Sequence, residues 1–145
     1  MADQLGGAFQ PSQDVGLTSN LSTTGSILSS GTLGIGYSAG AGGTVTQATS
    51  KSTAVTLNKI TGAITMNNAN LLTVTAVSFA VSNSLVAATD TIVVNHASVA
   101  TSGAYLVSVS AVGAGTFTVT VFNNTAGTLG EAIVIRFFVL KSVSA

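Results

Sequence analysis

The sequence predicts an all-β fold, a two-sheet antiparallel sandwich with an extended N-terminal arm. From Thr44 onward, apolar and polar residues alternate with a period of two, and no stretch shows a convincing helical periodicity. Turn-forming Asn, Gly and Ser residues separate the alternating runs. About eight short strands in roughly a hundred residues fit a sandwich, for which a jelly roll is the favoured topology and an immunoglobulin-like one the alternative.

Eight runs are predicted as strands. In chain order they span residues 44–49, 53–58, 62–66, 71–81, 91–96, 104–112, 116–122 and 132–141. The seventh run shows the pattern most clearly, because Phe117, Val119 and Val121 alternate with Thr118 and Thr120. A face of Val and Phe opposite a face of Thr and Ser is typical of a sandwich layer that separates the core from solvent.

The fourth run, 71–81, changes phase along its length. Leu72 and Val74 fall on one face, whereas Val77 and Phe79 fall on the other. This change predicts a β-bulge, or a strand that crosses between two buried environments.

The last run, 132–141, is apolar on both faces. This is typical of an interior strand that is covered on both sides, and the alternative is an interface strand with one face turned outward. Phe137 and Phe138 are adjacent, so they must point to opposite sides of the sheet. Arg136 is a charge within this apolar run, and we expect it to have a buried partner or to lie at an interface.

The first 43 residues differ in composition from the rest. They hold ten of the sixteen glycines, the only proline and two charged residues, Asp3 and Asp14. The sequence therefore divides into an arm, 1–43, and a sandwich domain, 44–145. The arm is either a disordered tail or a segment that becomes ordered on a neighbouring subunit, and its apolar residues favour the second reading. The candidate interface residues are Leu5, Phe9, Leu17, Leu21, Ile35, Tyr37, Arg136 and Phe138.

Charge is scarce in this chain. Only 6% of the residues are charged and the formal net charge is zero, whereas about a quarter of an ordinary domain is charged. We therefore expect other subunits to cover much of the surface. Four scattered cations form no basic patch, so no nucleic-acid partner is expected. The longest apolar run is too short to cross a membrane as a helix, and no membrane partner is expected.

The residues also argue against catalysis. The single histidine, His96, and Asp90 lie at opposite ends of one predicted strand, about 20 Å apart, too far to form a dyad. Glu131 remains a possible partner for His96, although no spacing supports it. The chain has no cysteine and no clustered metal ligands or paired carboxylates. We therefore expect no enzyme activity, no metal and no cofactor.

The segment 36–59 contains the block GGTVTQATSK, residues 42–51. Together with 62–66, 88–95 and 131–135, it resembles small virion proteins of tailed bacteriophages, in particular capsid decoration, or cement, proteins. The resemblance covers most of residues 36–145 and leaves 1–35 outside it.

The resemblance implies a structural protein with a jelly-roll body on the outer capsid surface of a virion. Its partners would be the major capsid protein, whose neighbouring subunits it clamps, and further copies of itself, with a dimer favoured over a trimer. Similar modules occur in phage fibres and tails, so the alternative is a fibre or tail module that binds a host-surface receptor or glycan.

Overall fold

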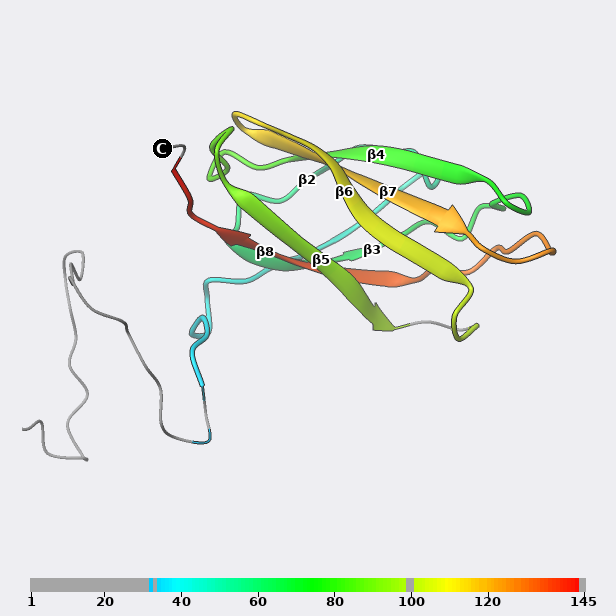
Figure 1. Cartoon of the computed structure of the whole chain (residues 1–145), viewed down its shortest axis with the longest axis horizontal. Coiled ribbons are helices and arrows are strands. Elements are labelled where there is room, and N and C mark those ends of the chain that lie inside the picture. The colour runs from blue at the N-terminus through cyan, green and yellow to red at the C-terminus, as the bar shows by residue number, and fades with distance from the viewer. Residues whose placement is uncertain (1–31, 33, 99–100, 144–145) are drawn as a thin grey trace, which may run out of the picture. The chain divides into compact units, whose positions relative to one another are not determined.

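The computed structural model describes residues 32, 34–98 and 101–143 (Figure 1). The chain divides into two compact units, Met1–Ile35 and Gly36–Ala145. The second unit contains all of the strands in the described residues, and each of the eight predicted runs overlaps one of them. In chain order the strands are β1 (Thr44–Thr46), β2 (Val55–Thr56), β3 (Thr61–Thr65), β4 (Ala76–Ser82), β5 (Thr91–Ser98), β6 (Tyr105–Gly113), β7 (Thr116–Asn123) and β8 (Val134–Leu140).

The strands form two four-stranded sheets that pack face to face (Figure 1). Sheet A has the order β1-β3-β8-β5, and sheet B has the order β2-β4-β7-β6. The last strands of the two sheets, β5 and β6, lie next to each other in Figure 1 and close one side of the sandwich. The predicted all-β, two-sheet sandwich is confirmed.

The two outermost pairs differ from the antiparallel expectation. Strands β1 and β2 pair in parallel with β3 and β4, whereas the other four pairs are antiparallel. From β1 to β6, consecutive strands alternate between sheet A and sheet B. The chain therefore returns to one sheet only after it has added a strand to the other. A jelly roll is built from antiparallel Greek keys, so this order does not confirm that topology.

The core lies between the two inner faces and follows the predicted alternation. On β7, Phe117, Val119 and Val121 are buried, while Thr118 and Thr120 face outward. The central strand β8 contributes three further buried side chains from its inner face. Strand β8 lies between β3 and β5, but Arg136, Phe138 and Leu140 on its outer face are exposed, so the prediction that this strand is covered on both sides is wrong.

The phase change in the run 71–81 has a simpler cause than the predicted bulge or crossing. Strand β4 begins only at Ala76, and Leu72 and Val74 are exposed in the loop before it. Val74 also has a positive φ of 49°, which a β-branched residue rarely adopts in a strand. That prediction is therefore wrong, and the register shifts occur instead in β5, before Ser98, and in β6, before Ala111.

Buried polar side chains hold the connection between β1 and β2 against the body. The Gln47 Nε2 donates to the carbonyl oxygens of Lys51 and Thr53, at 3.0 and 2.8 Å, and its Oε1 accepts from the Asn67 N–H at 3.1 Å. The Lys51 Nζ donates to the carbonyl oxygens of Asn67 and Glu131, at 2.7 and 2.6 Å. Gln47 and Lys51 belong to the block GGTVTQATSK, so these two residues of the block serve the fold.

Residues 36–43, which the sequence assigned to the arm, lie against the body. The Tyr37 hydroxyl donates to the Val139 carbonyl oxygen at 2.8 Å, and the Ala63 N–H donates to the Gly43 carbonyl oxygen at 2.9 Å. In the described ranges, no helix is long and apolar enough to cross a membrane.

Candidate functional site

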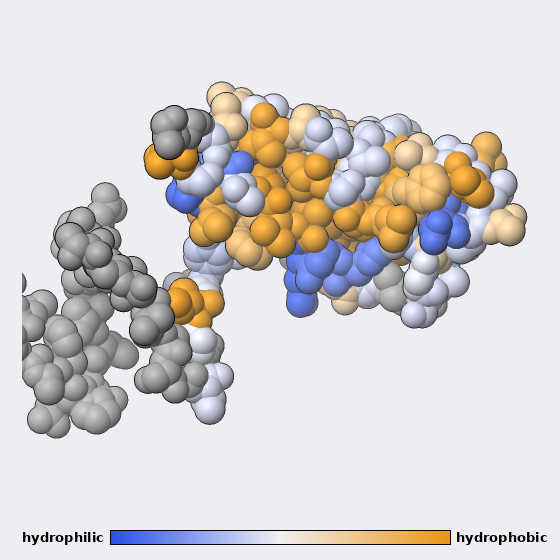
Figure 2. Space-filling view, in the orientation of Figure 1, coloured by the Kyte–Doolittle hydropathy of each residue, from blue (hydrophilic) through white to orange (hydrophobic). Residues whose placement is uncertain are grey.

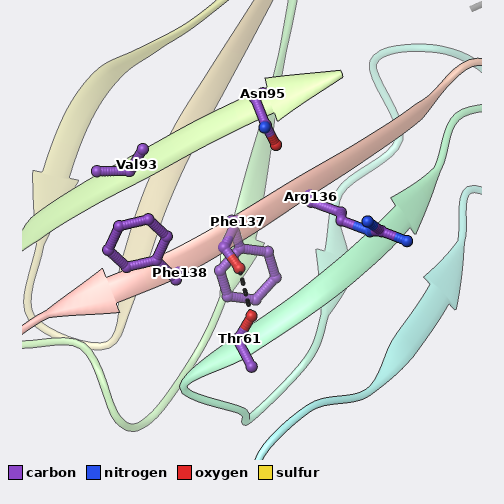
Figure 3. Close-up of a pocket in the computed structure, with 6 residues that line it drawn as sticks. All are labelled: Thr61, Val93, Asn95, Arg136, Phe137 and Phe138. Atoms are coloured by element: carbon purple, nitrogen blue, oxygen red, sulfur yellow. Dashed lines mark hydrogen bonds between the residues drawn. The ribbon is translucent and has the colours of Figure 1, made fainter. Parts of the chain in front are cut away.

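The outer face of sheet A carries a pocket of about 190 Å³ (Figure 3). Its walls come from the three neighbouring strands β3, β8 and β5, which are far apart in sequence. The residues that line it are Thr61, Val93, Asn95, Arg136, Phe137 and Phe138.

Cross-strand register explains how these residues meet. Thr61 and Val93 both pair with Phe138, so the three form one row across the sheet. Asn95 pairs with Arg136 and belongs to the next row. Side chains alternate along each strand, so both rows face outward.

Figure 3 shows how the pocket is divided between the two sides of β8. Phe138 lies beside Val93, Arg136 extends toward β3, and the Phe137 ring projects to the inner side of the sheet. The Thr61 hydroxyl donates to the Phe137 carbonyl oxygen at 2.9 Å and closes the β3 side. Phe137 is 2% exposed and Phe138 is 39% exposed, which confirms that the two rings point to opposite sides.

The apolar character of this face continues beyond the pocket. Val93 and Leu140 are 41% and 53% exposed, and Leu140 follows Phe138 on the outward side of β8. Figure 2 shows hydrophobic surface across β5 and β6, with hydrophilic surface below β5. Of the two interpretations of the run 132–141, its outer face fits the interface strand better, because Phe138 and Leu140 remain 39% and 53% exposed among the described residues.

Arg136 differs from the other cations of the body. Lys141 pairs with Asp90 at 2.7 Å, and Lys51 and Lys59 donate to backbone carbonyl oxygens. Within residues 34–98 and 101–143, Arg136 forms no ion pair and no hydrogen bond through its side chain.

The outer face of sheet B has a different chemistry. Ser78 and Thr120 hydroxyl oxygens lie 2.8 Å apart, and Thr120 donates to the Ser110 hydroxyl at 2.9 Å, which forms a row of hydroxyl groups across β4, β7 and β6. The other outward positions on these strands are mainly Ala, Ser and Thr, with Leu106 and Phe122 at one end. None of the outward positions on these three strands is charged.

One group of polar side chains is buried near the end of β5. The rings of His96 and Tyr105 meet edge to face, with centroids 6.5 Å apart, and Thr101 donates to Glu131 Oε1 at 2.5 Å. Within the described residues, the His96 Nε2, the Tyr105 hydroxyl and the Glu131 Oε2 are buried without hydrogen-bond partners. Burial first, and then the nearby Glu131 carboxylate, raises the pKa of Tyr105 to about 12.

The Asp90 carboxylate is held by its neighbours. Asp90 bonds to Lys141 and accepts from the Ala87 N–H, and these bonds lower the pKa of its carboxyl group. Asp90 directly precedes β5, whereas His96 lies within the strand, which continues to Ser98. No group of three or more His, Cys, Asp or Glu side chains in the described ranges is arranged to hold a metal ion.

The structure brings two of the eight candidate interface residues together, Arg136 and Phe138. Ile35 is exposed, and Tyr37 is half exposed with its hydroxyl bonded to Val139. The remaining four candidates lie outside the described residues: Leu5, Phe9, Leu17 and Leu21.

Sequence reasoning missed three residues of the pocket, Thr61, Val93 and Asn95. Each can be placed on a strand from its neighbours, but the register between strands decides which of them meet, and the sequence carries no direct signal for that register. Comparison of the chain with protein-family models, with curated proteins and with solved structures finds no match.

Proposed function

We propose that this chain is a structural virion protein that cements a bacteriophage capsid. It bridges neighbouring major capsid subunits on the outer surface of the shell and performs no catalysis. The observation that carries the proposal is the outer face of sheet B, where three adjacent strands present no charged side chain. The resemblance of residues 36–145 to capsid decoration proteins gives the setting.

An uncharged sheet face suits permanent contact with another protein. Covering a charged side chain removes its hydration, which is costly unless it is paired, whereas covering Ala and Thr costs little. The hydroxyl row formed by Ser78, Thr120 and Ser110 keeps its internal hydrogen bonds and still offers acceptors to a partner or to bridging water. Many such modest contacts, repeated over a shell, add up to strong attachment.

The alternative, a fibre or tail module that binds a glycan, needs exposed aromatic side chains at loop tips. The aromatic residues that could serve this role are Tyr37, Tyr105 and Phe122. Tyr105 is only 3% exposed, and the Tyr37 hydroxyl is bonded to the backbone of β8. Phe122 is partly buried and Tyr37 is 50% exposed, so none of the three is a fully exposed aromatic side chain at a loop tip, and this supports the capsid role.

The test places charge on the proposed contact face. The double variant Ser78→Lys/Ser108→Lys is mixed with purified phage capsids that lack the protein, and bound copies per capsid are counted by quantitative mass spectrometry. We expect occupancy to fall by about tenfold or more, since each lysine must lose its hydration at the interface.

The matched control is Ser52→Lys/Ala88→Lys, which adds the same charge at exposed loop positions outside the sheet faces. It should bind capsids as the wild type does, and both variants should keep the wild-type melting temperature within a few degrees. Full occupancy of the Ser78→Lys/Ser108→Lys variant contradicts the proposal. Binding of the wild type to host cells, with no affinity for capsids, supports the fibre or tail role instead.

A further inference from the structure

The pocket on sheet A and the N-terminal segment have complementary properties. Residues 36–143 of the sequence have four cationic and two anionic side chains, which gives a net side-chain charge of +2. Residues 1–31 carry Asp3 and Asp14 and no Lys, Arg or His, which gives −2. The overall neutrality of the chain therefore conceals two parts of opposite charge.

The complementarity is sharpest at Arg136. Its guanidinium group has no partner in the described residues and stands beside the exposed apolar side chains Phe138 and Val93. A ligand that fits this surface has an apolar group to contact Phe138 and Val93, and a carboxylate close to that group to pair with Arg136. Residues 1–31 offer that combination, because Phe9, Leu17 and their neighbours accompany Asp14.

The dimensions are compatible with an inserted side chain. The pocket measures about 190 Å³, whereas a cavity of roughly 150 Å³ is sufficient to hold a benzene ring. A segment of this length spans ~105 Å when fully extended and about 30 Å as a flexible coil. Such a segment can reach the pocket of an adjacent molecule.

We infer that two copies of this chain associate by exchanging N-terminal segments. Residues 1–31 of each copy occupy the sheet A pocket of the other, with an apolar side chain against Phe138 and an aspartate paired with Arg136. A two-fold exchange satisfies both pockets and both segments, so it closes the assembly as a dimer and leaves no free end to propagate a filament. The inference extends the proposed function by naming how the copies associate, and it leaves the face of sheet B free for the capsid.

The test uses the full chain without capsids, so its failure is separate from a failure of the proposed function. Sedimentation velocity over a concentration series gives the dimer dissociation constant of the wild type, of Arg136→Glu, of Asp3→Lys/Asp14→Lys and of the three substitutions combined. We expect each reversal alone to weaken the dimer by about tenfold or more and the combination to restore most of the loss, because opposite charges again meet.

Two matched controls separate local contact from general effects. Lys59→Glu makes the same change in net charge at a partly buried residue that does not line the pocket and should leave the dissociation constant unchanged. Phe138→Ser should weaken the dimer, whereas Leu72→Ser, which removes an exposed leucine from a loop, should not. Thermal melting of every variant confirms folding.

Three results of the main experiment would overturn the inference, and one result of the controls would do the same. These are a monomeric wild type, a dimer insensitive to Arg136→Glu, and a combined variant that recovers no affinity. Equal weakening by Lys59→Glu also overturns it, since the effect would then follow net charge and not the pocket.

Discussion

The rings of Phe117 on β7 and Phe137 on β8 lie 5.2 Å apart and are tilted by 57°, so that one aromatic pair joins the centres of the two sheets. The next residue, Phe138, has the same side chain on the opposite face of the same strand and is 39% exposed. These two adjacent phenylalanines therefore have different structural roles. Phe137 packs between the two sheets, and Phe138 forms part of the outer surface.

This contrast gives the first prediction. Phe137→Ala removes a ring that is 2% exposed and leaves a cavity between the sheets, so it should lower the free energy of unfolding by about 3–5 kcal/mol. Phe138→Ala should lower it by less than about 1 kcal/mol, because its ring already contacts solvent. Urea denaturation of both variants measures the difference, and equal losses would contradict the assignment of the two faces.

The second prediction concerns the buried amine of Lys51. Lys51→Met keeps the length of the side chain but leaves the carbonyl oxygens of Asn67 and Glu131 without their donor, which should cost about 2 kcal/mol. The matched change at the surface, Lys59→Met, removes one exposed hydrogen bond to Gly40 and should have little effect. Chemical denaturation at neutral pH compares the two variants, and a stable Lys51→Met protein would refute the role of Lys51.

Lys51 should also leave a signature in the pH dependence of stability. Burial lowers the pKa of Lys51 from its usual 10.5, and the Glu131 charge only partly opposes this. Since the folded-state pKa lies below the unfolded one, the contribution of Lys51 is complete above pH 10.5 and is lost as the pH falls through the folded-state value. The stability of the wild type relative to Lys51→Met should therefore grow as the pH rises toward 10.5, and a constant difference would count against a buried, desolvated amine.

Tyr105 should act in the opposite direction at higher pH. Its folded-state pKa of about 12 lies above the unfolded value of 10.0, so its contribution is complete below pH 10 and is lost as the pH rises toward 12. We expect the wild type to lose stability over this range relative to Tyr105→Phe, because ionisation of the phenol is less favourable in the fold than in the unfolded chain. Parallel alkaline denaturation curves for the two proteins would be inconsistent with this assignment.

A glycine on β3 provides the last prediction. A Cβ atom at Gly62 would lie 2.6 Å from Leu57 Cδ2, 2.9 Å from Phe137 Cε1 and 3.0 Å from the Gly43 carbonyl oxygen, so Gly62→Ala should lower the free energy of unfolding by about 2 kcal/mol. The same change at Gly113 meets only Thr116 Cγ2, at 3.6 Å, and should alter it by less than about 0.5 kcal/mol. A thermal melt of each variant tests the pair, and a neutral Gly62→Ala would show that the sheets separate easily at this point.

The sequence predicted the positions of the strands far better than it predicted which strands pair with each other. Alternation along a run such as 116–122 reports directly which side chains face the core, and β7 follows it residue by residue. The parallel pairing of β1 with β3 and of β2 with β4 has no such local signal, because it depends on how the chain moves between the sheets. The bulge expected in 71–81 failed for a related reason: apolar residues in an exposed loop can imitate a strand.

The candidate site divides in the same way. Arg136 and Phe138 could be selected from the sequence because a charge and two adjacent aromatic rings are unusual within one apolar run. Thr61, Val93 and Asn95 are ordinary strand residues that become part of a pocket only through pairing across β8. Gln47 and Lys51 stand out in the sequence as part of a distinctive block, yet their side chains donate hydrogen bonds to backbone carbonyl oxygens within the fold.

The position of β8 has a consequence for how the protein is made. It is the last strand in the described residues and lies between β3 and β5, so the centre of sheet A is missing until β8 joins it. Only β6 and β7 are both consecutive in the chain and paired in one sheet, and such long-range pairing makes folding slow. Until β8 arrives, β3 and β5 expose edges able to pair with other chains. The solubility of the folding chain therefore depends on β8, and deletion of residues 134–140 should cause aggregation in the cell.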